Sequence, residues 1–419
     1  MKKRLKKILV CAYSCEPGFS SEREIGWKWS NLIAKNHEAF VITRLSNKNT
    51  IEDYISQNNI ATSLKFIYYD LPNWTRKWKK GERGLYLYYT MWQYGAYKKC
   101  LKLHKKEKFD IVHYITFGSM LLPHFMALMP TKFVLGPVGG GENVPLRFIG
   151  DFDIKSKVSE IIRHIFQSLQ KINPLFLLTC LNSNKILVRT KESYKMIPFR
   201  FRHKTELMLE TGAPEELINY KGNTIKESNE IQIVTVGRFI YSKINLMTLK
   251  VIKEFKQKYK VPFKFIIIGD GKQRAKLEQY CVKNNLEDCI IFTGWIKREE
   301  VFNHLLKSDI YFSTTFKEGG TWAFFEAVAI GLPIVCAKIS GPDMIVADEC
   351  GFKIKLTNPK DVVDKMASAL NDLSINSNLR EELSMKSKNH LLNNLTWGKM
   401  MNRIENIYNK PVKIIEAQL

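Results

Sequence analysis

The sequence alternates short apolar runs with longer segments of helical character along most of its length. Twelve runs are rich in Val, Ile and Phe, at residues 6–13, 39–45, 64–71, 109–117, 132–140, 185–191, 231–237, 263–269, 289–294, 309–316, 332–337 and 351–354. Most are continuously apolar, which is typical of parallel strands buried on both faces. The sequence therefore predicts an α/β protein with two successive Rossmann-like, doubly wound domains of about six βα units each.

The chain length of 419 residues fits two or three domains of ordinary size. The polar stretch 210–230, which contains Gly212, Pro214 and Gly222, predicts a linker. We therefore expect a first domain at 1–210, a second at 211–395 and a final helical stretch at 396–419. Ligands of such sheets bind beyond the carboxyl ends of the strands, so two facing domains predict a binding cleft.

The cysteines and the amino terminus indicate a cytoplasmic protein. None of the eight cysteines forms a Cys-x-x-Cys pair, and several lie in apolar runs, which predicts buried thiols and argues against disulfides or a zinc site. The basic start is followed by only about seven apolar residues, which is marginal for a signal peptide, and we interpret it as the first strand. No apolar run reaches the roughly 18 residues needed to span a bilayer.

The net charge of +24 is unevenly distributed. Between Arg76 and Lys108 there are eleven Lys and Arg against two Glu, with seven interleaved aromatics. The simplest interpretation is a solvated helical face above an aromatic core stripe. Two others are peripheral contact with an anionic membrane and binding of nucleic acid. Because no nucleic-acid motif accompanies the region, we expect no nucleic-acid partner and favour contact of 76–108 with the inner face of the cell membrane.

Two places in the second half combine features of an anion site. Arg238 follows a predicted strand, and Lys243 lies where the next helix begins. Gly319 and Gly320 follow the strand at 309–316 and precede a helix predicted from Thr321, where exposed backbone N–H groups and the helix dipole favour a phosphate.

Two glutamates bracket the start of that helix. Glu326 is a single carboxylate in an apolar run, about one turn into the helix, and could accept hydrogen bonds from sugar hydroxyls. Glu318, in the turn, could reach a second sugar. Purely structural roles are also open: compensation of the helix dipole for Glu318 and an ion pair with a lysine for Glu326.

These segments resemble a known family. The stretch EGGTWAFFEAVAIGLPIV resembles the Glu-x7-Glu signature of glycosyltransferase family 4, retaining enzymes of the GT-B fold, and VGRFIYSK is similar to its Gly-Arg-x4-Lys segment. GDG and FTGW lie between them in the family's order. AYSCEPGFSSEREIGWKW and GPVGGGE resemble a subgroup that builds bacterial surface polysaccharides. The resemblance covers most of residues 8–400.

The resemblance implies a function and a division of labour. It implies a GT-B fold with an amino-terminal acceptor domain, a carboxy-terminal donor domain across a cleft, and a final helix that returns to the first domain. The implied reaction moves a sugar, with retention, from a nucleotide-diphosphate-sugar to a hydroxyl of a glycan or lipid-linked glycan, in polysaccharide or lipopolysaccharide biosynthesis. It also implies that no metal or other cofactor takes part.

Roles carry over residue by residue. Arg238 and Lys243 would hold the donor diphosphate, Glu326 the ribose, and Glu318 the hydroxyls of the reacting sugar. The other implied positions are Trp295 and Ile296 at the nucleobase, Gly319, Gly320 and Thr321 at the phosphates, His113 near the reacting sugar, and Ser21, Glu22, Gly139 and Gly140 as acceptor or loop candidates.

The sequence departs from the family pattern, and alternatives stay open. Ile244 stands where a glycine usually follows the diphosphate lysine, and His113 could equally be a core histidine. Asp151 and Asp153 have the Asp-x-Asp spacing of metal-dependent glycosyltransferases of another fold, but we interpret them as a solvated loop. Other functions to weigh are a nucleotide-sugar epimerase or phosphorylase of the same fold, and a non-catalytic nucleotide- or glycan-binding protein.

Overall fold

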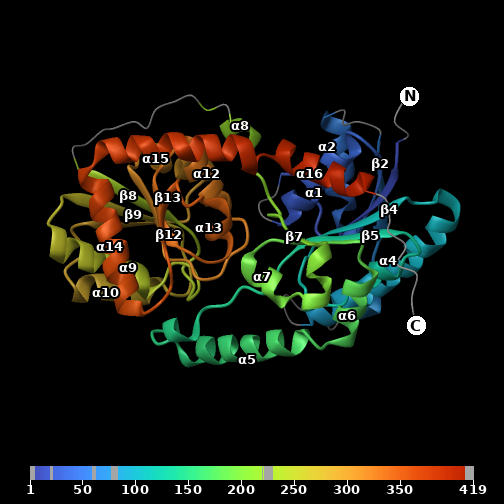
Figure 1. Ribbon diagram of the computed structural model, residues 1–419, viewed down its shortest axis with the longest axis horizontal. Coiled ribbons are helices and arrows are strands. Elements are labelled where there is room, and N and C mark those ends of the chain that lie inside the picture. Colours follow the sequence, from blue (N-terminus) through green and yellow to red (C-terminus); the bar gives the residue numbers. More distant parts are fainter. Residues whose placement is uncertain are drawn as a thin grey trace. The chain divides into compact units, whose positions relative to one another are not determined.

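The computed structural model describes residues 5–18, 22–58, 63–76, 84–218, 220 and 230–410. The chain divides into two compact units (Figure 1): residues 1–141, 166–210 and 401–419 form the first, and residues 142–165 and 211–400 form the second. One boundary therefore falls after Glu210. Residues 142–165, which we expected in the first domain, belong to the second unit because Val144, Phe148 and Phe152 pack into its core.

The first unit is built on a parallel sheet. In the described residues it has seven strands, in the order β3-β2-β1-β4-β5-β6-β7. Their bounds are β1 Lys7–Ala12, β2 Glu38–Arg44, β3 Leu64–Tyr69, β4 Ile111–Thr116, β5 Lys132–Val138, β6 Lys185–Val188 and β7 Thr205–Leu207. The six strands predicted for this half are confirmed. The sequence missed β7, which is only three residues long and has no apolar run.

Helices surround this sheet, and α1 contacts β1, β2 and β4. Their bounds are α1 Glu22–Ala34, α2 Lys48–Asn58, α3 Asn73–Arg76, α4 Leu85–Glu107, α6 Pro174–Asn182 and α7 Lys191–Met196, with short 3-10 helices at η1 Leu45–Asn47, η2 Phe125–Leu128 and η4 Phe199–Lys204.

The expected membrane surface at 76–108 lies mainly on α4. Tyr88, Tyr89 and Trp92 are buried there, and the Trp92 indole donates a hydrogen bond to the Tyr69 carbonyl at 2.9 Å. Trp78 lies outside the described residues. These buried aromatic side chains stabilise the core of the first unit, whereas Tyr86 and Tyr94 of the same helix are 65% and 45% exposed, so membrane contact of the region stays a prediction.

The second unit contains a parallel sheet with six strands in the described residues, in the order β10-β9-β8-β11-β12-β13. All six predicted strands are confirmed: β8 Ile231–Val236, β9 Phe263–Ile268, β10 Ile290–Gly294, β11 Ile310–Ser313, β12 Ile334–Ala337 and β13 Gly351–Ile354. The strand order reverses between β8 and β11. The loops that leave these neighbouring strands therefore adjoin, which is where ligands bind in open α/β sheets.

The remaining elements complete the second unit and the end of the chain. They are η3 Leu146–Phe148, α8 Glu215–Ile218, α9 Leu246–Tyr259, α10 Arg274–Lys283, α11 Arg298–Lys307, α12 Trp322–Ile330, α13 Ser340–Ile345, α14 Pro359–Ile375, α15 Ser377–His390 and the π-helical η5 Leu391–Leu395. Two helices have residues in both units: α5 Ile154–Gln170 and α16 Trp397–Asn409, whose residues from Met401 belong to the first.

Two composition-based expectations can be compared with this fold. All eight cysteines are buried and unpaired, which confirms the prediction of buried thiols. Within the described ranges, no helix is both long enough and apolar enough to cross a membrane.

Candidate active site

The structure brings two predicted site residues together at the switch point of the second sheet. Lys243 lies in the loop between β8 and α9, and its ammonium group forms an ion pair with the carboxylate of Glu318, which follows β11. Both side chains are largely buried. Arg238 lies two residues after β8 and is exposed. Lys243 and Arg238 therefore lie on one loop, and their role in binding an anion stays a prediction.

The departure at Ile244 has a structural explanation. Its side chain is 4% exposed and packs in the core of the second unit. Its backbone N–H donates to the Arg238 carbonyl at 3.4 Å, which closes the loop around the cations. The next residue, Asn245, caps α9 by accepting a hydrogen bond from the Met247 N–H at 2.9 Å. Ile244 therefore anchors the loop by burial.

The Gly-Asp-Gly segment, residues 269–271, packs against the loop that follows β8. The Gly237 N–H donates to the Ile268 carbonyl at 2.9 Å, and the Phe239 N–H donates to the Asp270 carbonyl at 2.8 Å. A Cβ on Gly269 would lie 2.0 Å from the Gly237 carbonyl oxygen, and Gly269 has a φ of +130°. Only glycine allows this close backbone approach, so the segment positions the arginine-bearing loop.

The turn between β11 and α12 leads into a helix start. Gly319 and Gly320 precede Thr321, the N-cap residue of α12. The Thr321 hydroxyl is buried and, among the described residues, has no hydrogen-bond partner. Gly341, which the sequence analysis missed, holds the turn: its N–H donates to the Glu318 carbonyl at 2.9 Å, and a Cβ there would lie 1.6 Å from the Gly319 oxygen.

Glu326 is buried on α12, at 6% exposure. Burial raises the pKa of its carboxyl group, and the nearby Arg298 guanidinium lowers it. The Arg298 Nε lies 3.3 Å from Oε1 of Glu326, and the guanidinium also lies over the Trp322 ring, 5.6 Å from its centroid. The structural alternative for Glu326 was an ion pair with a lysine, and the partner that the structure shows is an arginine, which is itself largely exposed.

The predicted nucleobase segment follows β10. Trp295 is 70% exposed and Ile296 is half-buried, immediately after Gly294 at the strand end. An exposed indole beyond the carboxyl end of a strand is available for stacking.

A buried carboxylate that the sequence analysis missed joins the two loops of the site. Glu160 of α5 is fully buried; its Oε1 accepts a hydrogen bond from the Tyr241 hydroxyl at 2.8 Å, and its carboxylate pairs with the ammonium group of Lys317. Burial opposes ionisation, but Lys317 and Tyr241 outweigh it and lower the pKa of Glu160. Since Tyr241 lies on the loop after β8 and Lys317 on the loop after β11, Glu160 links the two loops.

Asp151 and Asp153 both have structural partners. Asp153 accepts hydrogen bonds from the N–H and hydroxyl groups of Ser156, at 3.1 and 2.7 Å, and so caps the first turn of α5. Asp151 forms an ion pair with Lys250 at 2.6 Å. These contacts favour the loop interpretation. Among the residues that the structure describes, no group of three or more His, Cys, Asp or Glu is arranged to hold a metal ion.

His113, predicted near the reacting sugar, lies in the core of the first unit. It is fully buried on β4; its Nε2 lies 2.6 Å from the Gly136 carbonyl and its Nδ1 2.6 Å from the Tyr408 hydroxyl of α16. The carbonyl only accepts, so Nε2–H donates and Nδ1 accepts from Tyr408. The neutral imidazole is thus satisfied on both sides. We therefore correct the catalytic assignment in favour of a core histidine.

The burial of His113 predicts a pH dependence of stability. Burial lowers its pKa to about 4, from a usual value near 6.5. Between these values the unfolded chain binds a proton that the folded chain does not, so stability falls as pH decreases from 6.5 towards 4, by about 3 kcal/mol in all. Urea unfolding at pH 7, 6 and 5 measures this loss. His113→Gln should lose less stability over the same range, and parallel curves for the two proteins would contradict the prediction.

The remaining candidates in the first unit have structural contacts. Glu22, at the start of α1, accepts a hydrogen bond from the Phe117 N–H at 2.5 Å, and burial raises its pKa. The Gly139 N–H donates to the Gly118 carbonyl at 2.8 Å, and the Gly140 carbonyl accepts from the Gln167 amide at 2.5 Å. Their roles towards an acceptor stay predictions, and Ser21 lies outside the described residues.

Parts of the sequence are similar to known proteins. Residues 219–390 match the family model described as glycosyl transferases group 1. The chain is 25% identical over 324 residues to the Escherichia coli UDP-Gal:alpha-D-GlcNAc-diphosphoundecaprenol alpha-1,3-galactosyltransferase, covering 73% of this chain and 77% of that protein. Other curated relatives match over 35% to 51% of their own length.

Solved structures agree along the full chain. A glycosyltransferase from Rickettsia africae ESF-5 superposes with a TM-score of 0.64 at 13% identity, covering 97% of this chain and 98% of that one. Anabaena HepE, solved in complex with UDP and glucose, superposes with a TM-score of 0.60 at 13% identity, covering 96% and 98%. At this identity the superpositions establish the fold, which is GT-B. The sequence matches support a glycosyltransferase similar to those of family 4.

Proposed function

We propose that the protein transfers a sugar from a nucleotide-diphosphate-sugar to a hydroxyl of a glycan or lipid-linked glycan, with retention of the anomeric configuration. The product class would be a polysaccharide or lipopolysaccharide. Support for the acceptor class comes from the E. coli relative, whose name specifies a diphosphoundecaprenol-linked acceptor. We propose that the reaction needs no protein-bound metal ion and no other cofactor.

The observation that carries the proposal is the Lys243–Glu318 ion pair at the switch point. Glu318 neutralises Lys243 in the absence of a ligand. A donor diphosphate would attract the ammonium group more strongly than one carboxylate does, because it carries more charge. The Glu318 carboxylate would then be available to accept hydrogen bonds from the donor sugar. Nucleotide binding would therefore switch both side chains to their catalytic partners.

Catalysis would rest on stabilisation of the leaving group. As the bond between the anomeric carbon and the diphosphate breaks, negative charge grows on the phosphate oxygens. Arg238, Lys243 and the N–H groups at Gly319 and Gly320 would stabilise that charge, and the buried Thr321 hydroxyl, which has no hydrogen-bond partner among the described residues, would add a donor. The acceptor hydroxyl would attack from the side that the diphosphate leaves, and a phosphate oxygen would take its proton.

The test is calorimetric titration and thermal shift with a panel of nucleotide-sugars and nucleoside diphosphates. The panel starts with UDP compounds, because the E. coli relative's name specifies UDP-Gal and the Anabaena structure contains UDP. Arg238→Ala removes a charge-assisted contact and should weaken binding roughly tenfold to a hundredfold. Glu326→Gln should weaken it too, without loss of stability, since it removes a buried carboxylate.

A matched control is Lys365→Ala, which removes an exposed cation of the same unit that pairs with Asp361. It should bind nucleotide like the wild type. Unchanged binding in both site variants would mean that the donor site lies elsewhere. Turnover of the donor to an isomer in the absence of acceptor would instead support the epimerase alternative.

A further inference from the structure

Helix α5 (Ile154–Gln170) is inverted relative to an ordinary surface helix. Its buried residues are all polar: Glu160 is fully buried, and Gln167 and Gln170 are each 5% exposed. All seven of its large apolar side chains are exposed, by 45% to 80%. They include Ile154, Ile161, Ile162, Ile165, Phe166 and Leu169. A helix that buries its polar face and exposes its apolar face leaves a hydrophobic surface in need of a partner.

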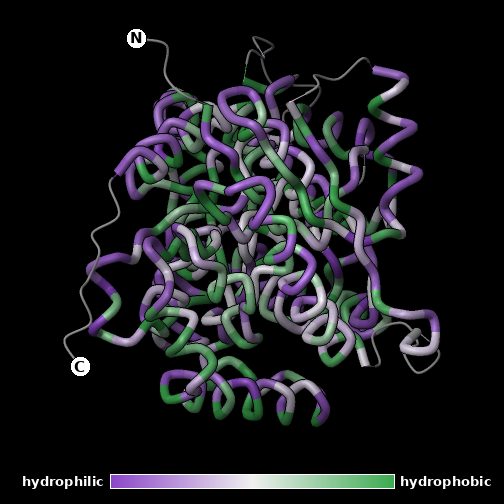
Figure 2. Tube along the Cα trace, turned by 90° about the vertical axis from the view of Figure 1, so that its right-hand side faces the viewer, coloured by the Kyte–Doolittle hydropathy of each residue, from purple (hydrophilic) through white to green (hydrophobic). Residues whose placement is uncertain are grey.

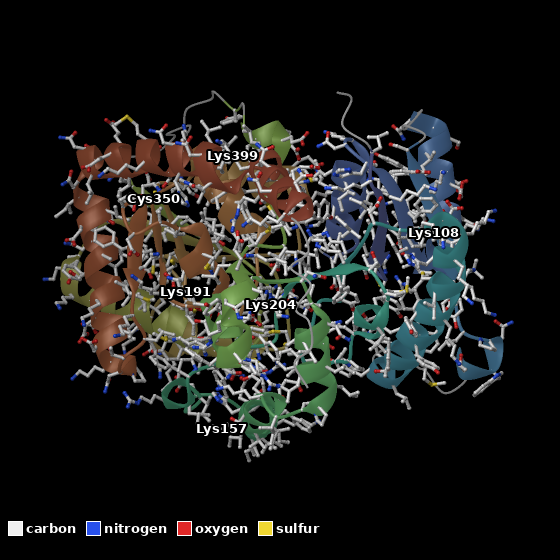
Figure 3. The ribbon with its side chains drawn as sticks, turned by 45° about the vertical axis from the view of Figure 1, so that its right-hand side comes forward. Lys108, Lys157, Lys191, Lys204, Cys350 and Lys399 are labelled. Carbon is white, nitrogen blue, oxygen red and sulfur yellow. The ribbon has the colours of Figure 1, made fainter. Side chains whose placement is uncertain are left out.

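The exposed apolar residues form one stripe, which a single charged residue, Lys155, enters at the N-terminal end. At about 100° per residue, they fall within an arc of about 140°, with Glu160 on the opposite side. Figure 1 shows α5 along the lower edge of the view, and Figure 2 shows hydrophobic residues alternating with hydrophilic ones on the lowest helical turns. In Figure 3, carbon-rich side chains project downward beside the labelled Lys157.

The charges on this helix have one sign at its surface. Lys155 and Lys157 are exposed or half-buried, and the single acidic residue of α5, Glu160, is buried, where it pairs with Lys317 and lies 3.8 Å from the Nε of Arg163. On the helical projection, Lys157 lies beside one edge of the apolar stripe and Lys155 lies at its N-terminal end, while Arg163 turns towards Glu160. Apolar residues flanked by cations complement a lipid bilayer with anionic headgroups, into which the stripe inserts while the cations contact phosphate groups.

We propose that α5 is a membrane-binding helix that lies in the headgroup region of an anionic bilayer. The alternative partner is a second copy of the same helix face. Pairing two such faces would bring like charges together beside the stripe, and their repulsion disfavours this dimer. The proposal is independent of the membrane contact expected at 76–108. It does not depend on which sugar or nucleotide the protein uses.

The experiment is flotation of the purified full-length protein with phosphatidylcholine vesicles and with vesicles that also contain phosphatidylglycerol. The wild type should float with the anionic vesicles at least tenfold more than with the neutral ones. Ile165→Asp and Phe166→Asp, at side chains already exposed, should lower that binding at least tenfold without changing thermal unfolding. Lys155→Ala combined with Lys157→Ala should lower binding to the anionic vesicles only.

The matched control is Ile375→Asp, which places the same charge on an isoleucine of α14 that is 68% exposed. It should float like the wild type. Absence of wild-type flotation, or equal flotation of the α5 variants and the control, would overturn the proposal. So would concentration-dependent dimerisation that Ile165→Asp abolishes while no protein binds vesicles, because the stripe would then be a contact between two copies.

Discussion

Lys243→Ala is expected to lower kcat by about 10²- to 10³-fold with the donor that the binding screen identifies. This is the usual cost of removing one preorganised group that stabilises developing charge in a transition state. Binding of the intact donor should weaken less than kcat falls, because the charge on the leaving diphosphate grows only as the bond breaks. Steady-state and single-turnover kinetics, with donor binding measured separately, provide the test.

A comparison of three variants separates this role from a structural one. Lys256→Ala removes a lysine of the same unit that forms an ion pair with Asp288 at 2.6 Å, and it should retain wild-type kcat. Glu318→Gln releases Lys243 from its carboxylate partner, so a nucleoside diphosphate should bind more tightly while kcat falls. If Lys243→Ala kept kcat within threefold of the wild type, Lys243 would not contact the leaving group.

The strands of this protein could be predicted because their burial is continuous. Twelve predicted runs correspond to twelve strands, since a strand covered on both faces needs an apolar residue at nearly every position. The boundary of the second unit could not be predicted in the same way. Nothing local in residues 142–165 indicates that Phe148 and Phe152 pack with residues such as Phe316, far along the chain.

In the candidate site, too, local features could be predicted from the sequence and contacts between distant residues could not. The loops after β8 and β11 were found from sequence because glycines, cations and carboxylates follow predicted strands. Arg298 and Glu160 were missed because each acts through a partner distant in sequence: Glu160 lies 157 residues from Lys317. His113 was misassigned for a related reason, because its partner Tyr408 is 295 residues away and only the fold reveals that both ring nitrogens are occupied.

Helix α5 shows that the period of apolar residues does not predict which face of a helix is buried. The period of its apolar residues shows an amphipathic helix, and the usual rule would turn that stripe inward. The structure turns it outward, because the buried side of the helix holds Glu160 against Tyr241 and Lys317. A polar network that positions the site loops therefore occupies the face where an ordinary helix would place its apolar residues.

Glu160→Ala is expected to destabilise the second unit by about 3–5 kcal/mol. The substitution removes the partner of Lys317, whose ammonium group would remain largely buried without its counter-ion, and breaking one side of a buried ion pair has this cost. It also removes the acceptor of the Tyr241 hydroxyl, so the loop between Arg238 and Lys243 should loosen and the donor should bind more weakly. Urea unfolding and calorimetric titration measure the two effects.

The double variant Glu160→Leu, Lys317→Met separates the charge from the packing. Replacing both members of a buried pair by apolar side chains of similar volume is often neutral or stabilising, so the double variant should recover most of the stability that Glu160→Ala loses. If Glu160 acts only through stability, donor affinity should recover with it. If Glu160 positions the loops, affinity should stay low in the stable double variant, since neither loop regains its hydrogen bond. A loss below about 1 kcal/mol in Glu160→Ala would show that water replaces the carboxylate and that the network does not hold the site.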